Sequence, residues 1–136
     1  MTYSINIYYF RDKNHPSVIA WSIANEPVSN TPDAAPYFQE VADYSRSLDR
    51  TRPVMAVLSR GLDEDQSPPA LDIIGLNRYD SWYSDTGMLE VITKQLSNEL
   101  MGWKEKYPDK PLMITEYGGD TISGIYRVLH IFRPGM

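Results

Sequence analysis

Residues 18–27 read Val-Ile-Ala-Trp-Ser-Ile-Ala-Asn-Glu-Pro, a short apolar run that ends in an acidic residue and a proline. Residues 112–118, Leu-Met-Ile-Thr-Glu-Tyr-Gly, likewise end a short apolar run with an acidic residue, here followed by tyrosine and glycine. Apolar runs of this length are typical of strands buried in a parallel sheet, and the proline stops further strand pairing. Because barrel enzymes place their chemistry at the carboxyl ends of such strands, Glu26 and Glu116 are the first candidates for a functional site.

Two more apolar runs and two helical patterns lie between these stretches. Residues 54–58 and 72–77 are predicted to be buried strands, and apolar residues recur every three or four positions over 37–48 and 89–107, which predicts helices. Strands that alternate with helices indicate a parallel sheet. The loop between the second and third strands is too brief for a full crossover helix, so a reduced helix is expected there.

Composition limits the classes of protein that fit. The chain has 136 residues, 42% of them hydrophobic, and can bury one core of ordinary size. A net charge of -5 disfavours nucleic acid and anionic membrane surfaces as partners. Without cysteine there is no disulfide, thiol nucleophile or thiolate metal site. Residues 1–10 lack the basic opening and cleavage site of a signal peptide, and no apolar run reaches the roughly 20 residues of a membrane span.

Four buried strands with polar residues at their carboxyl ends fit either an open doubly wound sheet or part of an eight-stranded barrel. The chain has neither a Gly-x-Gly-x-x-Gly motif nor a Walker loop, so the nucleotide-binding version loses its main support. A complete barrel takes about 250 residues. We therefore predict an α/β fold that forms roughly half of a (β/α)8 barrel.

Paired carboxyl groups are the minimal equipment of a glycosidase. Cleavage with retention requires one acid that protonates the leaving oxygen and one carboxylate that attacks the anomeric carbon, about 5 to 5.5 Å apart. Glu26 follows the apolar Trp21 and Ile23, which favours the acid, whereas the turn after Glu116 can bring donors to an ionised nucleophile. Taken singly, either glutamate could instead be a charged residue that ends a strand in solvent.

Aromatic and amide side chains follow the third strand and suit the faces and hydroxyl groups of a sugar. Asn77 and Tyr79 stand nearest the strand end, and Trp82 and Tyr83 come next. These two could equally pack as an aromatic loop on the barrel rim. Asn25, directly before the first glutamate, can donate a hydrogen bond to a sugar hydroxyl.

Other polar residues receive no chemical role. His15 is expected in a turn, the run Asp63-Glu64-Asp65 in a solvated loop and not a metal site, and His130 in the tail. No metal site and no organic cofactor are predicted.

Residues 11–27 closely resemble the catalytic domain of the β-glucuronidases of glycoside hydrolase family 2. Residues 76–83 and 114–124, the latter including Asp120-Thr121-Ile122-Ser123-Gly124, look like the same enzymes at their sixth and seventh barrel strands. The family-like region runs from about 11 to 124, and the ends 1–10 and 125–136 diverge. The resemblance implies that residues 1–136 are an incomplete catalytic TIM barrel domain, covering about strands 4 to 7.

The resemblance also implies roles. Glu26 corresponds to the acid/base and Glu116 to the nucleophile, while Asn25 contacts the 2-hydroxyl of the sugar. The implied reaction is retaining hydrolysis of terminal β-D-glucuronides, in glycosaminoglycans or conjugates, without metal or cofactor. Related β-galactosidases usually carry Gly-Asn-Glu at the first motif, which favours the glucuronide. A family 2 hydrolase for another sugar, such as a β-galactoside, and a non-catalytic truncated remnant are the alternatives. The resemblance also maps Asn77, Tyr79 and Tyr83 onto the lining of the family's substrate pocket.

Several family features are missing from the chain. It lacks the Asn-x-Lys motif that grips the glucuronate carboxylate in this family, and Asp80 stands where many members have tyrosine. Barrel strands one to three and eight are absent too, so the chain alone is expected to be inactive. In full-length relatives the resemblance implies a carbohydrate as substrate and homo-oligomers, located in lysosomes in animals and in the cytoplasm in bacteria.

Overall fold

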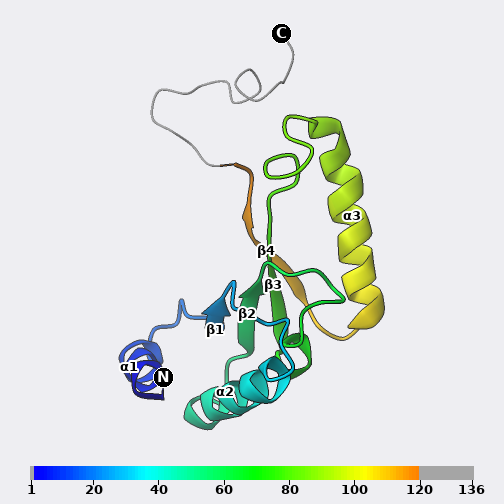
Figure 1. Ribbon diagram of the computed structural model, residues 1–136. Coiled ribbons are helices and arrows are strands. Elements are labelled where there is room, and N and C mark those ends of the chain that lie inside the picture. Colours follow the sequence, from blue (N-terminus) through cyan, green and yellow to red (C-terminus); the bar gives the residue numbers. More distant parts are fainter. Residues whose placement is uncertain (1, 120–136) are drawn as a thin grey trace.

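Four parallel strands form the centre of the computed structural model, which describes residues 2–119 (Figure 1). Each strand pairs with the next along the chain, in the order β1-β2-β3-β4. This confirms the predicted α/β fold with a parallel sheet. The strands are β1 (Trp21–Asn25), β2 (Val54–Leu58), β3 (Ile73–Arg78) and β4 (Leu112–Tyr117).

Strand β1 is shorter than the apolar run that predicted it. Its ladder begins where the Trp21 amide donates to the Pro53 carbonyl at 2.9 Å. Val18 lies before that point, and its carbonyl accepts instead from the Arg52 guanidinium at 2.7 Å. The arginine therefore holds the chain that leads into β1 against the start of β2.

Of the three α-helices within residues 2–119, two lie where the sequence predicts them, namely α2 (Ala34–Leu48) and α3 (Leu89–Lys106). Helix α1 (Thr2–Asp12) was not predicted. Helix α1 is held by its contacts with later elements: the Tyr9 ring stacks on Trp21 at 4.0 Å, and the Tyr44 hydroxyl donates to Asn6 at 2.6 Å. None of the helices within residues 2–119 is long and apolar enough to cross a membrane.

The connection between β2 and β3 contains only η1 (Pro68–Ala70), one turn of 3-10 helix, which confirms the expected reduced helix. Asp72 fastens the end of this connection to the start of β2, because its amide donates to the Val54 carbonyl and its carboxylate accepts from the Val54 amide, each at 2.8 Å. The two strands then approach so closely at Gly75 that an added Cβ would lie 3.0 Å from the Ala56 carbonyl oxygen. Glycine is needed there for space.

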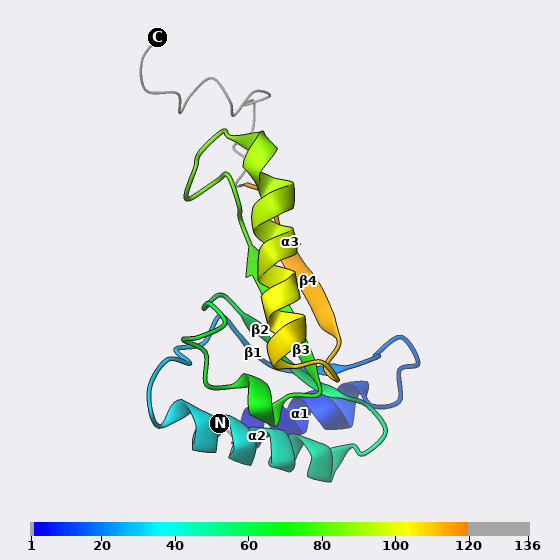
Figure 2. The same ribbon diagram turned by 90° about the vertical axis from the view of Figure 1, so that its right-hand side faces the viewer.

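Two apolar clusters fix the helices on the sheet. Trp103 of α3 is fully buried against Leu58, Ile74 and Leu76, and α3 runs beside β3 and β4 (Figures 1 and 2). A second cluster joins α2 to the start of β2. Every residue of β2 is buried, as expected for a central parallel strand. The second cluster consists of Ala34, Phe38, Ala42, Val54 and Ala70.

The acidic loop between β2 and β3 corrects one expectation. Asp63 and Glu64 are exposed, but Asp65 is only 4% exposed and is not solvated. A buried carboxylate is tolerated when donors satisfy it, and Ser29 and Ser67 donate to both of its oxygens. Residues 120–136, which include His130, the motif 120–124 and the divergent end 125–136, lie outside the described residues.

Candidate active site

A pocket of about 550 Å³ lies at the carboxyl ends of the strands. Parallel strands end at the same edge of a sheet, so residues that are far apart in sequence meet there. Each of the four strand ends contributes at least one residue, and both candidate glutamates are among them. The lining consists of Asn25, Glu26, Ser59, Asn77, Arg78, Tyr79, Asp80, Tyr83, Ser84 and Glu116.

Glu26 is turned sharply out of the line of β1. Its backbone has φ of 45°, in the left-handed region that non-glycine residues rarely occupy. Its amide still donates to the Val57 carbonyl at 2.8 Å, so the residue is tied to β2 on one side. Strained backbone of this kind persists only where surrounding contacts impose it, and it is common at functional sites.

Asn77 lies between the two glutamates and is 3% exposed. Its Nδ2 donates to Glu26 Oε1 at 2.7 Å, and its Oδ1 accepts from the Thr115 hydroxyl at 2.7 Å. The same Nδ2 lies 3.5 Å from Asn25 Oδ1. In the sheet Asn77 is the register partner of Glu116, next to an irregularity in the β3–β4 pairing. One amide thus orients the first glutamate and contacts the strand that bears the second.

Tyr79 binds the other glutamate. Its phenol donates to Glu116 Oε2. This hydrogen bond, followed by burial and by the negative charges of Glu116 and Glu26, raises the pKa of Tyr79 to about 12. The Tyr83 ring meets Tyr79 edge-on at 5.5 Å and is itself 73% exposed at the rim. Glu26 and Glu116 therefore have different donors, an amide and a phenol.

Arg78 has a structural role that was not predicted from the sequence. Its guanidinium donates to the carbonyls of Leu58, Asn77 and Arg60, and pairs with Glu99 of α3 at 2.6 Å. Its Nε also donates to Glu99 at 2.7 Å, so all three guanidinium nitrogens have partners within the described part of the chain. The arginine fastens the ends of β2 and β3 to α3.

Asp80 adds a third carboxyl group to the pocket lining. Burial and the charge of Glu99 raise its pKa, while Arg78 acts in the opposite direction. From the sequence, Asp80 was noted only because many family members have tyrosine at this position.

Trp82 is the predicted site residue that does not line the pocket. It is half-buried and packs on the turn after β4, where a Cβ added to Gly119 would lie 2.6 Å from the indole. Its position supports the segment that follows Glu116. His15 lies in a turn after α1, as predicted, with its amide donating to the Asp12 carbonyl at 2.9 Å.

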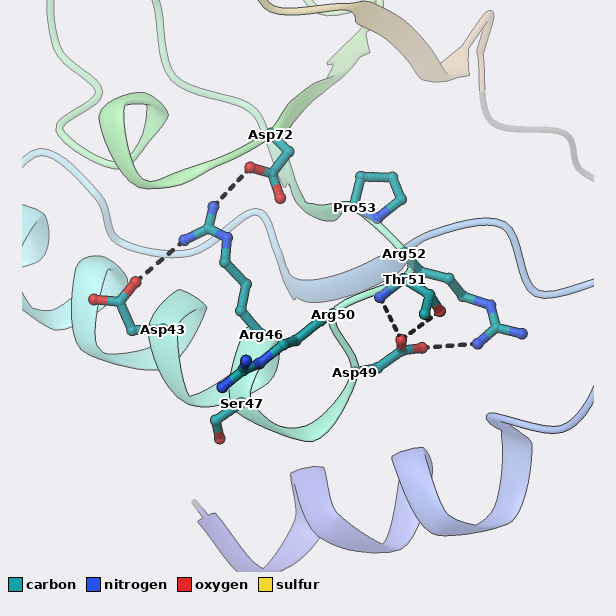
Figure 3. Close-up of a pocket in the computed structure, with 9 residues that line it drawn as sticks. All are labelled: Asp43, Arg46, Ser47, Asp49, Arg50, Thr51, Arg52, Pro53 and Asp72. Carbon is teal, nitrogen blue, oxygen red and sulfur yellow. Dashed lines mark hydrogen bonds and ion pairs between the residues drawn. The ribbon is translucent and has the colours of Figure 1, made fainter.

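A second pocket lies at the opposite, amino-terminal ends of the strands (Figure 3). Its charged groups pair with one another: Arg46 lies between Asp43 and Asp72, and Arg52 pairs with Asp49. Hydrogen bonds from Thr51, Trp21 and Arg52 hold the pKa of Asp49 well below its usual range, against the effect of its burial. This cluster fastens α2 to the starts of β2 and β3 and has no unpaired carboxylate for chemistry.

Within the described part of the chain, no group of three or more His, Cys, Asp or Glu side chains is placed to hold a metal ion.

Comparison with known proteins shows which family and which solved structures this chain is similar to. The family model described as "Glycosyl hydrolases family 2, TIM barrel domain" matches residues 1–131. The β-glucuronidase of Rattus norvegicus is 46% identical over 116 residues, which are 85% of this chain and 18% of the rat enzyme. The chain thus spans about a fifth of the length of the curated relatives it matches.

Solved structures agree with this match. The β-glucuronidase of an uncultured Clostridium superposes with a TM-score of 0.87 at 41% identity, covering 93% of this chain and 22% of that one. A β-glucuronidase of Ruminococcus gnavus in complex with D-glucuronic acid superposes with a TM-score of 0.82 at 35% identity, covering 93% of this chain and 23% of that one.

Proposed function

This chain belongs to glycosyl hydrolase family 2, and from that membership we propose that it supplies the two catalytic carboxyl groups of a retaining β-glucuronidase. The observation that carries the proposal is the shared pocket: Glu26 and Glu116 line it together, each held by its own hydrogen-bond donor. The substrate class follows from the relatives, which are β-glucuronidases, one of them solved with D-glucuronic acid.

In the proposed first step, Glu116 attacks the anomeric carbon while Glu26 gives its proton to the leaving oxygen. The bond to the aglycone breaks, and the sugar is left as an ester of Glu116. In the second step Glu26 removes a proton from water, the water oxygen attacks the anomeric carbon, and the bond to Glu116 breaks. The sugar leaves with retained configuration.

The remaining pocket residues orient these groups. Asn77 directs the carboxyl of Glu26, and the neutral phenol of Tyr79 directs the carboxylate of Glu116. Asn25, which borders the same pocket, is proposed to contact the 2-hydroxyl of the sugar. Tyr83 stands at the rim, where an aromatic ring can cover a sugar face.

The strands β1 to β4 are proposed to be strands four to seven of the barrel, with the family-like region over about 11–124. Among residues 2–119, the four parallel strands leave β1 and β4 with an unpaired edge each. Closing a barrel removes such edges and brings in the remaining strand ends. We therefore expect the chain alone to lack useful activity. Assembly into homo-oligomers and a lysosomal or cytoplasmic location stay predictions.

A hybrid enzyme provides the test. It is the uncultured Clostridium β-glucuronidase in which the segment that matches this chain is replaced by the present sequence. We expect it to hydrolyse p-nitrophenyl β-D-glucuronide in preference to the corresponding galactoside. Preference for the galactoside would contradict the proposed substrate.

Variants of the hybrid enzyme assign the two roles. Glu116→Ala should abolish formation of the glycosyl-enzyme, because no other carboxylate is proposed to attack. Glu26→Ala should retain activity on good leaving groups, and added azide should then yield the β-glycosyl azide. The matched control is Glu105→Ala, because Glu105 is an exposed glutamate on α3. This substitution should change neither the rate of glycosyl-enzyme formation nor the rate of hydrolysis. A β-glycosyl azide from the Glu116 variant instead would exchange the two roles.

A further inference from the structure

We propose that Asp65 is a positioning residue for Glu26 and acts through the loop that follows β1. The inference rests on the proposed role of Glu26 as acid/base. Asp65 does not line the pocket and cannot touch a substrate there. It is nevertheless a carboxylate with only 4% exposure, in a loop between β2 and β3 that has no regular structure at that point.

The two oxygens of Asp65 bind donors from two different segments. Oδ2 accepts from the hydroxyl of Ser29, in the loop after β1, at 2.6 Å. Oδ1 accepts from the amide and the hydroxyl of Ser67, in its own loop, at 2.9 and 2.6 Å. Both serines are fully buried. The carboxylate therefore joins the loop after β1 to the connection between β2 and β3.

A backbone contact strengthens this join. The Gln66 amide donates to the Ser29 carbonyl at 2.9 Å, next to the Ser29–Asp65 bond. Ser29 is thus held through its side chain and its main chain by two consecutive residues. The segment that holds it is itself closed by the Asp65 amide, which donates to the Gly61 carbonyl at 3.2 Å.

The position of Ser29 matters because only Pro27 and Val28 separate it from Glu26. On the other side, Glu26 is fastened to β2 by the bond to the Val57 carbonyl at 2.8 Å. Between these two anchors the backbone of Glu26 is kept at φ of 45°. Since such a conformation is unfavourable for a residue with a side chain, it has to be imposed from both ends. The proline restricts the link further, because its ring fixes its own φ.

Losing the Ser29–Asp65 bond weakens one of the two anchors, because only the Gln66–Ser29 backbone bond then holds the loop after β1. Glu26 can then relax toward negative φ, which turns its carboxyl away from the Asn77 amide that holds it at 2.7 Å. Small displacements of a catalytic group lower the rate strongly. A misplaced acid affects poor leaving groups most, because these need protonation in the first step, whereas good leaving groups need little.

Two matched substitutions separate positioning from general support of the fold. Ser29→Ala and Ser67→Ala each remove one buried hydroxyl that donates to Asp65 at 2.6 Å. Only the first removes the carboxylate's bond to the loop after β1, which is then held there by the Gln66–Ser29 backbone bond alone, whereas Ser67→Ala leaves the bond to Ser29 in place and keeps its own amide bond to the carboxylate. Both are made in the hybrid enzyme, and kcat/KM is measured for phenyl and p-nitrophenyl β-D-glucuronide.

We expect Ser29→Ala to lower kcat/KM for the phenyl substrate about 10- to 100-fold and for the p-nitrophenyl substrate about threefold. Ser67→Ala should change both by less than about threefold. Equal effects of the two serine substitutions, or a loss in Ser29→Ala that is the same for both substrates, would overturn the proposal.

Two additions keep the result unambiguous. If Ser29→Ala does not fold, Ser29→Cys, which keeps a weaker donor at the same place, is judged by the same criterion. Glu26→Ala is measured in parallel. A hybrid that keeps full activity without Glu26 contradicts the proposed function itself, whereas one that requires Glu26 but tolerates Ser29→Ala contradicts only the role of Asp65.

Discussion

Replacing Asn77 with alanine in the hybrid enzyme tests how much the site depends on one buried amide. The substitution removes the donor to Glu26 and the acceptor for Thr115, each at 2.7 Å. A hydrogen bond to a charged group contributes about 1.5 to 3 kcal/mol. Because Glu26 is exposed, water replaces part of the lost bond, and we take the lower half of that range, about 1.5 to 2 kcal/mol.

At about 1.4 kcal/mol per factor of ten, this corresponds to a loss of about 10- to 30-fold in kcat/KM for phenyl β-D-glucuronide, whose poor leaving group needs protonation, and to a smaller loss for the p-nitrophenyl substrate. The assay is steady-state hydrolysis of p-nitrophenyl and phenyl β-D-glucuronide. The matched control is Thr115→Val, which removes only the neutral bond to Asn77 Oδ1 and should lower kcat/KM about fivefold or less.

A second background shows whether the amide acts through the glutamate. In a Glu26→Ala hybrid, Asn77→Ala should lower the rate little further, because the carboxyl that the amide orients is already gone. If the kcat/KM of the Asn77→Ala variant for phenyl β-D-glucuronide lay within about threefold of that of the unsubstituted hybrid, the reasoning would be refuted. An undiminished loss in the Glu26→Ala background would also refute it and would place the role of Asn77 elsewhere.

Three further results are expected. Because the pKa of Tyr79 is raised to about 12, its phenol remains a donor to Glu116 as the pH rises through its ordinary value of 10.0; Tyr79→Phe should lower kcat/KM by a constant factor, about tenfold, from about pH 8 to 11, and a factor that shrinks as the pH passes about 10 would contradict this. Asp49 has a lowered pKa, so its stabilisation is present above the carboxyl pKa of the unfolded chain and is lost as the pH falls through the folded value. Asp49→Asn should therefore lower the free energy of unfolding by about 2 to 3 kcal/mol at neutral pH and less as the pH falls below about 4, seen as a shift in melting temperature, whereas Asp43→Asn, at a side chain 62% exposed, should have little effect. The 136-residue chain alone should aggregate and show no useful hydrolysis of p-nitrophenyl β-D-glucuronide; a soluble chain with a rate near that of the hybrid would show that half a barrel suffices.

The parts of the fold that sequence predicted are those whose signal is local. β2 is an unbroken apolar run from Val54 to Leu58 and was predicted with the observed bounds. Helix α3 was predicted from apolar residues spaced by three and four over residues 89–107, and it ends at Lys106, just before the proline that breaks it. Helix α1 has no such pattern: Ile7 and Phe10 are exposed, and Tyr9 is buried by stacking on Trp21, a contact that local sequence does not reveal.

The same distinction applies to the site. Glu26, Asn77 and Glu116 were identified because each follows or ends an apolar strand, and parallel strands end at one edge. The roles of Arg78 and Asp65 were not predicted, because they depend on partners that are distant in sequence. Arg78 binds Glu99, 21 positions away, and Asp65 binds Ser29, 36 positions away. The position of Arg78, directly after Asn77 at a strand end, was the only local sign that it belongs to the site.

The strand order has a consequence for biosynthesis. Each strand pairs with the strand made immediately before it, so the sheet can grow one strand at a time as the chain leaves the ribosome. Glu26 directly follows the first of these four strands, and the last of them carries Glu116. A nascent chain that stops short of β4 can already hold most of the scaffold. It still lacks the second glutamate, and the pocket is completed only when the final strand is added.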